Sequence, residues 1–238
     1  MKRTQTPYIL AEGKNANKRL DFQHKLFSGK LIEAFETASS MINISGATVV
    51  DFGCGTSSAY KDISTFIGCS GKYIGIDSSK EQISFNQSKY KAAYYLVGDE
   101  NSPQVMAALT SADIIYLRFV VMHQKNQNEF VKKIYNTAKS KAILIIQEPE
   151  NTPEHKAEMV KKYPFSGDLC DIKSKIGKRV DLNYNFAKDI EPVLKDLNPE
   201  TIIHRSENIQ IPLPQVKKLF TPERPLKEIH FRPLKLIH

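Results

Sequence analysis

One stretch decides how this chain folds, and it reads Val49-Val50-Asp51-Phe52-Gly53-Cys54-Gly55-Thr56-Ser57. The β-branched and apolar residues at 48–52 predict a short buried strand. Two glycines then permit a tight turn with exposed backbone, and a helix is expected over 57–67 with Ser57 or Ser58 as its N-cap. A carboxylate or phosphate binds well at such a helix start. By itself, a Gly-x-Gly turn is equally consistent with a tight connection that holds no ligand.

Strands and helices alternate along the chain on both sides of this turn. Each expected strand is a short apolar run, and each expected helix has apolar residues at helical spacing. The expected strands lie at 48–52, 72–76, 93–97, 113–117, 142–147, 201–204 and 226–231. The expected helices lie at 15–42, 57–67, 79–90, 103–109, 127–140 and 184–197. Such alternation implies parallel strands joined by crossovers, in a sheet with helices on both faces.

Two further acids follow the next two strands. Asp77 ends the second strand, where an acid can accept hydrogen bonds from both ribose hydroxyls of a nucleoside. Asp99 follows the third strand, where it could accept a hydrogen bond from an adenine amino group. Each acid alone is better explained as a cap or turn residue. Acids at the ends of three successive strands, Asp51 included, make coincidence much less credible and favour an adenosine-shaped site.

In order and spacing, these motifs resemble those of the class I S-adenosylmethionine-dependent methyltransferases that act on small molecules. VVDFGCGTS resembles the turn around the methionine part of the cofactor, IGIDSS the ribose segment and LVGDE the adenine segment. ADIIYLRFVVMH and AILIIQEPE resemble the fourth and fifth strands, so the likeness covers 49–150. KRLDFQ at 18–23 resembles the Arg-Leu-x-x-Gln helix of many members, and IGKR at 176–179 the stretch before their last helix. One departure is Ser57, where many members have a third glycine.

The resemblance implies a fold and a domain organisation. The expected fold is α/β, a Rossmann-like doubly wound seven-stranded sheet, mostly parallel with an antiparallel last strand. An N-terminal helical lid is expected at 1–44 and the methyltransferase domain at 45–238, with a substrate-side insertion at 151–183.

The resemblance also implies S-adenosyl-L-methionine as cofactor, S-adenosyl-L-homocysteine as product and no metal. The expected cofactor-binding residues are Asp51, Gly53, Cys54, Gly55, Asp77, Ser78, Asp99, Glu100, Arg118, Phe119 and Arg19. Arg19 would bind the cofactor's carboxylate from the lid, although an exposed helix charge is the alternative. Arg118 and Phe119 have alternatives too, namely pairing with a nearby acid and packing in the core. Cys54 is interpreted as a packed small residue rather than a nucleophile.

The residues that assist methyl transfer are expected after the fourth and fifth strands. A sulfonium methyl is already electrophilic, so the protein mainly positions the reactants. A general base is needed only when the acceptor must lose a proton. His123 and Glu148 are the candidate catalytic residues. The alternatives are a histidine held in a loop and a solvated loop acid.

Three other functions stay open at this point. A nicotinamide or flavin enzyme needs Gly-x-Gly-x-x-Gly/Ala, whereas this chain has Ser58 at the last position. A methyltransferase-like domain without catalysis would serve as a binding module. Methylation of RNA or protein is supported only by the net charge of +8, from 34 basic and 26 acidic residues. A small-molecule acceptor is favoured because the N-terminal helix and the insertion resemble those of small-molecule enzymes.

Composition bounds the remaining classes. The 238 residues suit one α/β domain with a small elaboration. No apolar run approaches the length of a membrane span or a signal peptide, so a cytoplasmic protein is expected. The three cysteines do not suggest a disulfide framework, and no pair has metal-ligand spacing.

Overall fold

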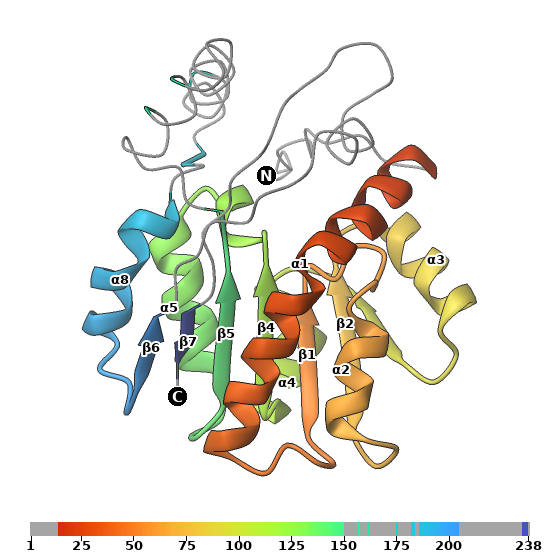
Figure 1. The fold of residues 1–238 in the computed structure, drawn as a ribbon, viewed down its shortest axis with the longest axis horizontal. Coiled ribbons are helices and arrows are strands. Elements are labelled where there is room, and N and C mark those ends of the chain that lie inside the picture. Colours follow the sequence, from red (N-terminus) through yellow and green to blue (C-terminus); the bar gives the residue numbers. More distant parts are fainter. Residues whose placement is uncertain are drawn as a thin grey trace.

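The fold is known from a computed structural model, which describes residues 14–149, 182–183, 186–204 and 235–237 and the single positions 157, 161 and 175. Within these residues, helices cover both faces of a seven-stranded sheet (Figure 1). The strands are β1 (Thr48–Phe52), β2 (Lys72–Asp77), β3 (Tyr94–Val97), β4 (Ile114–Arg118), β5 (Ile143–Gln147), β6 (Ile202–His204) and β7 (Lys235–Ile237). The helices are α1 (Lys14–Met41), α2 (Tyr60–Ile67), α3 (Lys80–Lys89), α4 (Pro103–Ser111), α5 (Gln127–Thr137) and α8 (Phe186–Asp196), with a short 3-10 turn, η1 (Val121–His123).

The strand order places a switch point between β1 and β4. The order across the sheet is β3-β2-β1-β4-β5-β7-β6, and the neighbours among β1 to β5 pair in parallel. Val50 of β1 lies between Ile74 of β2 and Ile115 of β4. Because the chain winds outward in both directions from this pair of strands, the carboxyl ends of β1 and β4 border a crevice of the kind that binds ligands. β7 pairs antiparallel with both β5 and β6.

Two apolar cores hold the layers together. On one face, α1 and α2 pack on the sheet with Phe35 and Ile63 fully buried. On the other face, α4, α5 and α8 pack on side chains such as Leu117. Tyr116 and Leu117 point to opposite faces because side chains alternate along a strand, and both are fully buried. Burial on both faces explains why β4 and β5 read as continuous apolar runs.

The predicted α/β sheet with parallel strands is confirmed, and most elements lie within a few residues of their expected bounds. The helix expected over 184–197 forms as α8 although Pro192 lies inside it. None of the helices in the described part of the chain is both long and apolar enough to span a membrane.

One expectation is wrong, and two others concern segments outside the described residues. Ser57 and Ser58 do not cap α2, because the N-cap is Ala59 and it makes no side-chain capping bond. Ser57 instead has a φ of 49°, in the left-handed region that extends the turn. The strand expected at 226–231 and nearly all of the insertion at 151–183 lie outside the described residues, while the strand paired with β5 is β7.

Candidate functional site

The glycine turn after β1 needs glycine for conformational and packing reasons. Gly53 has a φ of 73° and Gly55 a φ of 51°, which L side chains rarely adopt. A Cβ on Gly53 would lie 2.4 Å from Val120 Cγ2, and one on Gly55 would lie 3.2 Å from Leu20 Cδ1. Glycine was expected here because a ligand approaches closely. In the structure, protein neighbours on both sides of the turn already require glycine at these two positions.

Asp77 ties this turn to the next strand-to-helix connection. Its Oδ2 accepts a hydrogen bond from the Gly55 N–H at 3.0 Å, and its Oδ1 accepts one from the Ser79 N–H at 2.9 Å. Ser79 in turn caps α3 by accepting from the Gln82 N–H at 3.3 Å. The carboxylate of Asp77 is only partly buried, and Ser78 beside it is exposed. The structure thus brings the predicted ribose acid against the predicted glycine turn.

Asp99 and Glu100 form the turn before α4, at the carboxyl end of β3. Asp99 Oδ1 accepts hydrogen bonds from the Asn101 N–H and from the Ser102 hydroxyl, both at 3.0 Å. Glu100 Oε1 accepts one from Asn101 Nδ2 at 2.7 Å. Asp99 is exposed and follows the strand next to β2. It therefore has a structural role in a turn and also lies on the edge where an adenine group was predicted.

Asp51 is enclosed by protein rather than open to the crevice. Its side chain is buried, and the Tyr73 hydroxyl donates a hydrogen bond to its Oδ2 at 2.5 Å. Burial raises the pKa of Asp51 to about 6, against the lowering effects of the Tyr73 hydrogen bond and of the Arg118 charge. Asp51 therefore supports the base of the turn, and a ligand contact through its carboxylate stays a prediction.

Cys54 packs inside the turn and its thiol stays protonated. Burial raises the pKa of the Cys54 thiol well above its usual range, so it is a poor nucleophile. Asn86 of α3 donates to Cys54 Sγ at 3.7 Å and to the Gly55 carbonyl at 2.7 Å. Sequence analysis missed Asn86. The available signal was a polar residue three positions after Ile83, on the buried side of α3.

The first turns of α1 close over the glycine turn. Thr56 Oγ1 donates to Asp21 Oδ1 at 2.8 Å, and Leu20 lies against Gly55. One turn earlier, Gln82 Nε2 of α3 donates to Asn17 Oδ1 at 2.9 Å. Between these contacts, Arg19 Nη2 is buried without a hydrogen-bond partner among the described residues. A buried guanidinium nitrogen without a partner is costly, and it suits an anionic ligand at this place.

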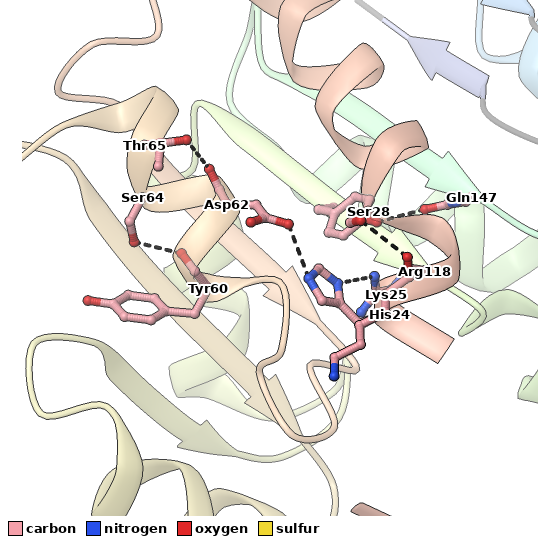
Figure 2. Close-up of polar contacts among 10 residues, drawn as sticks. His24, Lys25, Ser28, Tyr60, Asp62, Ser64, Thr65, Arg118 and Gln147 are labelled. Carbon is pink, nitrogen blue, oxygen red and sulfur yellow. Dashed lines mark hydrogen bonds and ion pairs between the residues drawn. The ribbon is translucent and has the colours of Figure 1, made fainter. Parts of the chain in front are cut away.

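Arg118 at the end of β4 contacts a histidine rather than the acid that was its alternative partner. Its Nη1 lies 2.9 Å from His24 Nδ1, and His24 Nε2 lies 3.1 Å from Asp62 Oδ2. Figure 2 shows the imidazole of His24 between the other two side chains. Burial, followed by the Arg118 charge, lowers the pKa of His24 to about 4, so it is neutral at neutral pH.

The tautomer of His24 follows from its two partners. Arginine has no hydrogen-bond acceptor, so Nδ1 must be the acceptor and Nε2 carries the proton that Asp62 accepts. Arg118, His24 and Asp62 thereby connect β4, α1 and α2. Sequence analysis missed His24 and Asp62, because 94 residues separate His24 from Arg118.

Glu148 and His123 flank the turn after β4 in different ways. Glu148 is buried, and its Oε1 accepts hydrogen bonds from the Val120 N–H at 2.7 Å and the Val121 N–H at 2.6 Å. His123 is half-buried at the end of η1. Phe119 has a φ of 56° and packs edge-on against Phe27 of α1, with ring centroids 5.1 Å apart. The carboxylate of Glu148 therefore organises the turn, and proton transfer by either candidate stays a prediction.

Together, the doubly wound sheet, the glycine turn and the acids after β2 and β3 define a Rossmann-like protein that binds a nucleoside-containing ligand. Comparison with protein families gives the more particular identity. The family model described as "Methyltransferase domain" matches residues 43–192, more than half of the chain. The chain therefore belongs to this methyltransferase family, and its predicted membership of the class I S-adenosylmethionine-dependent methyltransferases is confirmed.

Solved structures with the same fold are similar over almost the whole chain. Magnesium protoporphyrin IX methyltransferase from Synechocystis PCC 6803, crystallised with bound SAH, is 15% identical with a TM-score of 0.58, covering 95% of this chain and 90% of its own. A putative S-adenosyl-L-methionine-dependent methyltransferase from Methanococcus maripaludis is 18% identical with a TM-score of 0.52, covering 94% and 95%. A SAM-dependent methyltransferase from Aquifex aeolicus is 16% identical with a TM-score of 0.52, covering 95% and 97%. No curated protein matches the chain. At these identities the likeness shows a shared fold.

Proposed function

We propose that the protein binds S-adenosyl-L-methionine across the carboxyl ends of β1 to β4 and methylates a small-molecule acceptor. The observation that carries this proposal is the hydrogen bond from the Gly55 N–H to Asp77. It places a partly exposed carboxylate beside a glycine turn at the switch point, where a ribose would meet its acid. The bound SAH in the Synechocystis enzyme of the same fold supports the choice of cofactor and product.

Different residues of the site are assigned to successive parts of the cofactor. Asp77 would hold the ribose hydroxyls, with Ser78 beside it, and Asp99 and Glu100 would border the adenine. The turn from Gly53 to Gly55, with Cys54 packed behind it, would line the amino-acid part. When bound, the cofactor supplies an electrophilic methyl group on its sulfonium sulfur. The protein's own contribution is then to orient the cofactor and the acceptor in line.

The position of α1 supports the proposed lid and the small size of the acceptor. α1 meets the glycine turn through the Thr56–Asp21 hydrogen bond and through Leu20 against Gly55. A helix that covers the turn would enclose the site and exclude water, which suits a small molecule better than a long polymer. Arg19 would bind the cofactor's carboxylate from this helix, which would satisfy its buried Nη2.

If the acceptor must lose a proton, His123 is the better placed of the two candidate bases. Glu148 is buried, and one of its oxygens already accepts from two backbone N–H groups. His123 is only half-buried at the end of the turn that follows β4. We therefore assign Glu148 to the support of this turn and keep proton transfer for His123.

Calorimetry with S-adenosyl-L-homocysteine tests the cofactor assignment. The wild-type protein is expected to bind it, and Asp77→Ala to lose this binding. Lys25→Gln is the matched control, because Lys25 lies on the same helix, α1, and is exposed. A wild-type protein that does not bind S-adenosyl-L-homocysteine would favour a methyltransferase-like domain without catalysis.

The class of acceptor is tested with radiolabelled S-adenosyl-L-methionine. The purified protein is incubated in parallel with a small-metabolite extract, with total RNA and with total protein. Label that appears in the small-metabolite fraction supports the proposal. Label in RNA or protein, with binding that weakens steeply as salt increases for RNA, would replace the small-molecule acceptor by a polymer.

A further inference from the structure

Arg118 carries a positive charge that no carboxylate in the described part of the chain pairs with directly. Its guanidinium contacts His24 Nδ1 at 2.9 Å and lies 5.9 Å from the centroid of the Tyr116 ring. A guanidinium has five N–H donors, and the imidazole accepts from one of them. The Tyr116 hydroxyl also makes a hydrogen bond with Arg118, and the remaining donors stay available to a ligand at the end of β4.

The imidazole of His24 orients this guanidinium without neutralising it. If Asp62 contacted Arg118 directly, the pair would have no net charge. The neutral ring of His24 lies between them instead, accepting from Arg118 and donating to Asp62 (Figure 2). His24 is more buried than Asp62, with 12% of its side chain exposed against 31%. A buried, doubly bonded ring has little freedom, so it fixes the direction of the guanidinium.

The place of Arg118 in the sheet indicates which part of the cofactor it meets. The strand order runs β3-β2-β1-β4, so Arg118 of β4 lies across the site from Asp99, which follows β3. With adenine and ribose assigned to Asp99 and Asp77, the amino-acid end of an elongated cofactor extends past Gly53 toward β4. That end carries a carboxylate, and the planar fork of arginine matches a carboxylate with two parallel hydrogen bonds.

We infer that His24 and Asp62 are positioning residues that hold Arg118 as a binding group for the carboxylate at the amino-acid end of the cofactor. The inference rests on the proposed function. It adds to the role of Arg19, because the same helix, α1, carries both Arg19 and His24. When α1 lies over the turn, it therefore contributes the guanidinium of Arg19 itself and orients the guanidinium of Arg118 through His24.

The experiment compares two ligands that share the thioether and the adenosine. S-Adenosyl-L-homocysteine has the amino-acid carboxylate, and 5′-methylthioadenosine lacks it. Calorimetry gives the ratio of the two affinities for the wild-type protein and for each variant. Arg118→Gln is expected to weaken the binding of S-adenosyl-L-homocysteine by about 10- to 100-fold, the usual effect of losing a hydrogen bond to a charged group. It should leave 5′-methylthioadenosine nearly unchanged, and Arg118→Lys should fall between.

Two substitutions of His24 test the positioning role. His24→Gln keeps one acceptor for Arg118 and one donor for Asp62, so it should retain most of the wild-type affinity ratio. His24→Leu keeps the volume but removes both hydrogen bonds, so it should lose much of the ratio. Lys25→Gln, next to it on the exposed side of α1, should leave the ratio unchanged. Circular dichroism and thermal melting establish that each variant is folded.

Nitrogen NMR of the wild-type protein provides a readout that does not depend on any variant. At neutral pH, His24 should show an unprotonated Nδ1 and a protonated Nε2. An imidazolium or the opposite tautomer would overturn the orientation, since Arg118 could then not donate to Nδ1.

The outcomes separate this inference from the proposed function. If Arg118→Gln lowers the affinity for both ligands equally, or for neither, the carboxylate assignment is overturned. A His24→Leu protein that is folded and keeps the full ratio overturns the positioning role. If His24→Leu does not fold, a His24→Gln protein with the ratio of Arg118→Gln overturns it instead. Absence of S-adenosyl-L-homocysteine binding by the wild-type protein contradicts the proposed function itself.

Discussion

The carboxylate of Asp77 accepts a hydrogen bond from the Gly55 N–H at 3.0 Å, so the acid after β2 holds the turn after β1. Sequence reasoning assigned Asp77 to a ribose and the glycines to the amino-acid end of the same cofactor. The hydrogen bond joins these two motifs into a single structural unit. A substitution of Asp77 is therefore expected to change both the proposed ligand contact and the shape of the turn.

The two functions of Asp77 are separable by Asp77→Ala and Asp77→Asn. Alanine removes the acceptors of the Gly55 and Ser79 N–H groups, so it should lower the free energy of unfolding by about 1–3 kcal/mol and abolish measurable binding of S-adenosyl-L-homocysteine. Asparagine keeps one carbonyl oxygen, so it satisfies only one of the two N–H groups; it should be destabilised less than alanine while still binding more weakly. Urea unfolding and calorimetry give the two quantities. Undiminished affinity in either variant would show that Asp77 does not hold the ribose.

Gly53 and Gly29 are matched positions for the effect of adding one methyl group. Gly53→Ala places a Cβ 2.4 Å from Val120 Cγ2 at a φ of 73°, so strain and overpacking should cost about 2 kcal/mol or more. Gly29 lies within α1 and has no neighbour within 4 Å of an added Cβ. Gly29→Ala should therefore raise stability by about 0.5–1 kcal/mol through helix propensity. Urea titration of both variants beside the wild type measures the contrast, and a destabilised Gly29→Ala would contradict the open space beside α1.

Local sequence signals were sufficient for most of the sheet and for the acids at its edge. The strands β4 and β5 are buried on both faces, so their sequences are nearly continuous apolar runs that are difficult to misread. Asp77 and Asp99 follow their strands directly, and parallel strands end at one edge. Their common location was therefore predictable from position alone.

The features that could not be predicted from the sequence depend on contacts between residues far apart in the chain. Ser57 has the composition of an N-cap, but the turn imposes a φ of 49° on it and α2 begins three residues later. His24 looks like one more residue of an amphipathic helix until the fold brings it against Arg118, 94 positions away. No periodicity or motif reports a hydrogen bond over that separation.

Glu148 should behave as a structural residue when it is substituted. Glu148→Ala leaves the Val120 and Val121 N–H groups without their acceptor in a buried place, which should cost about 2–4 kcal/mol for two such groups. Glu148→Gln keeps a carbonyl oxygen at the same distance from the backbone and should cost much less. Thermal and urea unfolding compare the two variants. A stability of Glu148→Ala equal to that of the wild type would return Glu148 to the list of candidate bases.

The pH dependence of stability should reveal two buried groups that oppose each other. The pKa of Asp51 is raised from 3.8 to about 6, so the folded protein binds more protons than the unfolded chain in this interval. Its contribution to stability is therefore lost as pH rises through about 6. The pKa of His24 is lowered from 6.5 to about 4, so its contribution is lost as pH falls through this interval.

Asp51→Asn separates these opposing effects. Asparagine does not titrate, and its carbonyl oxygen can still accept the hydrogen bond from Tyr73. The stability of this variant relative to the wild type should therefore rise between about pH 4 and 6.5, because the loss due to Asp51 is removed. His24→Gln should show the opposite slope over the same interval. Urea unfolding across this range checks both signs, and parallel pH profiles for all three proteins would mean that neither group has a shifted pKa in the folded state. Differences between variants are the quantity to measure, because the exposed carboxylates contribute equally to each profile and cancel.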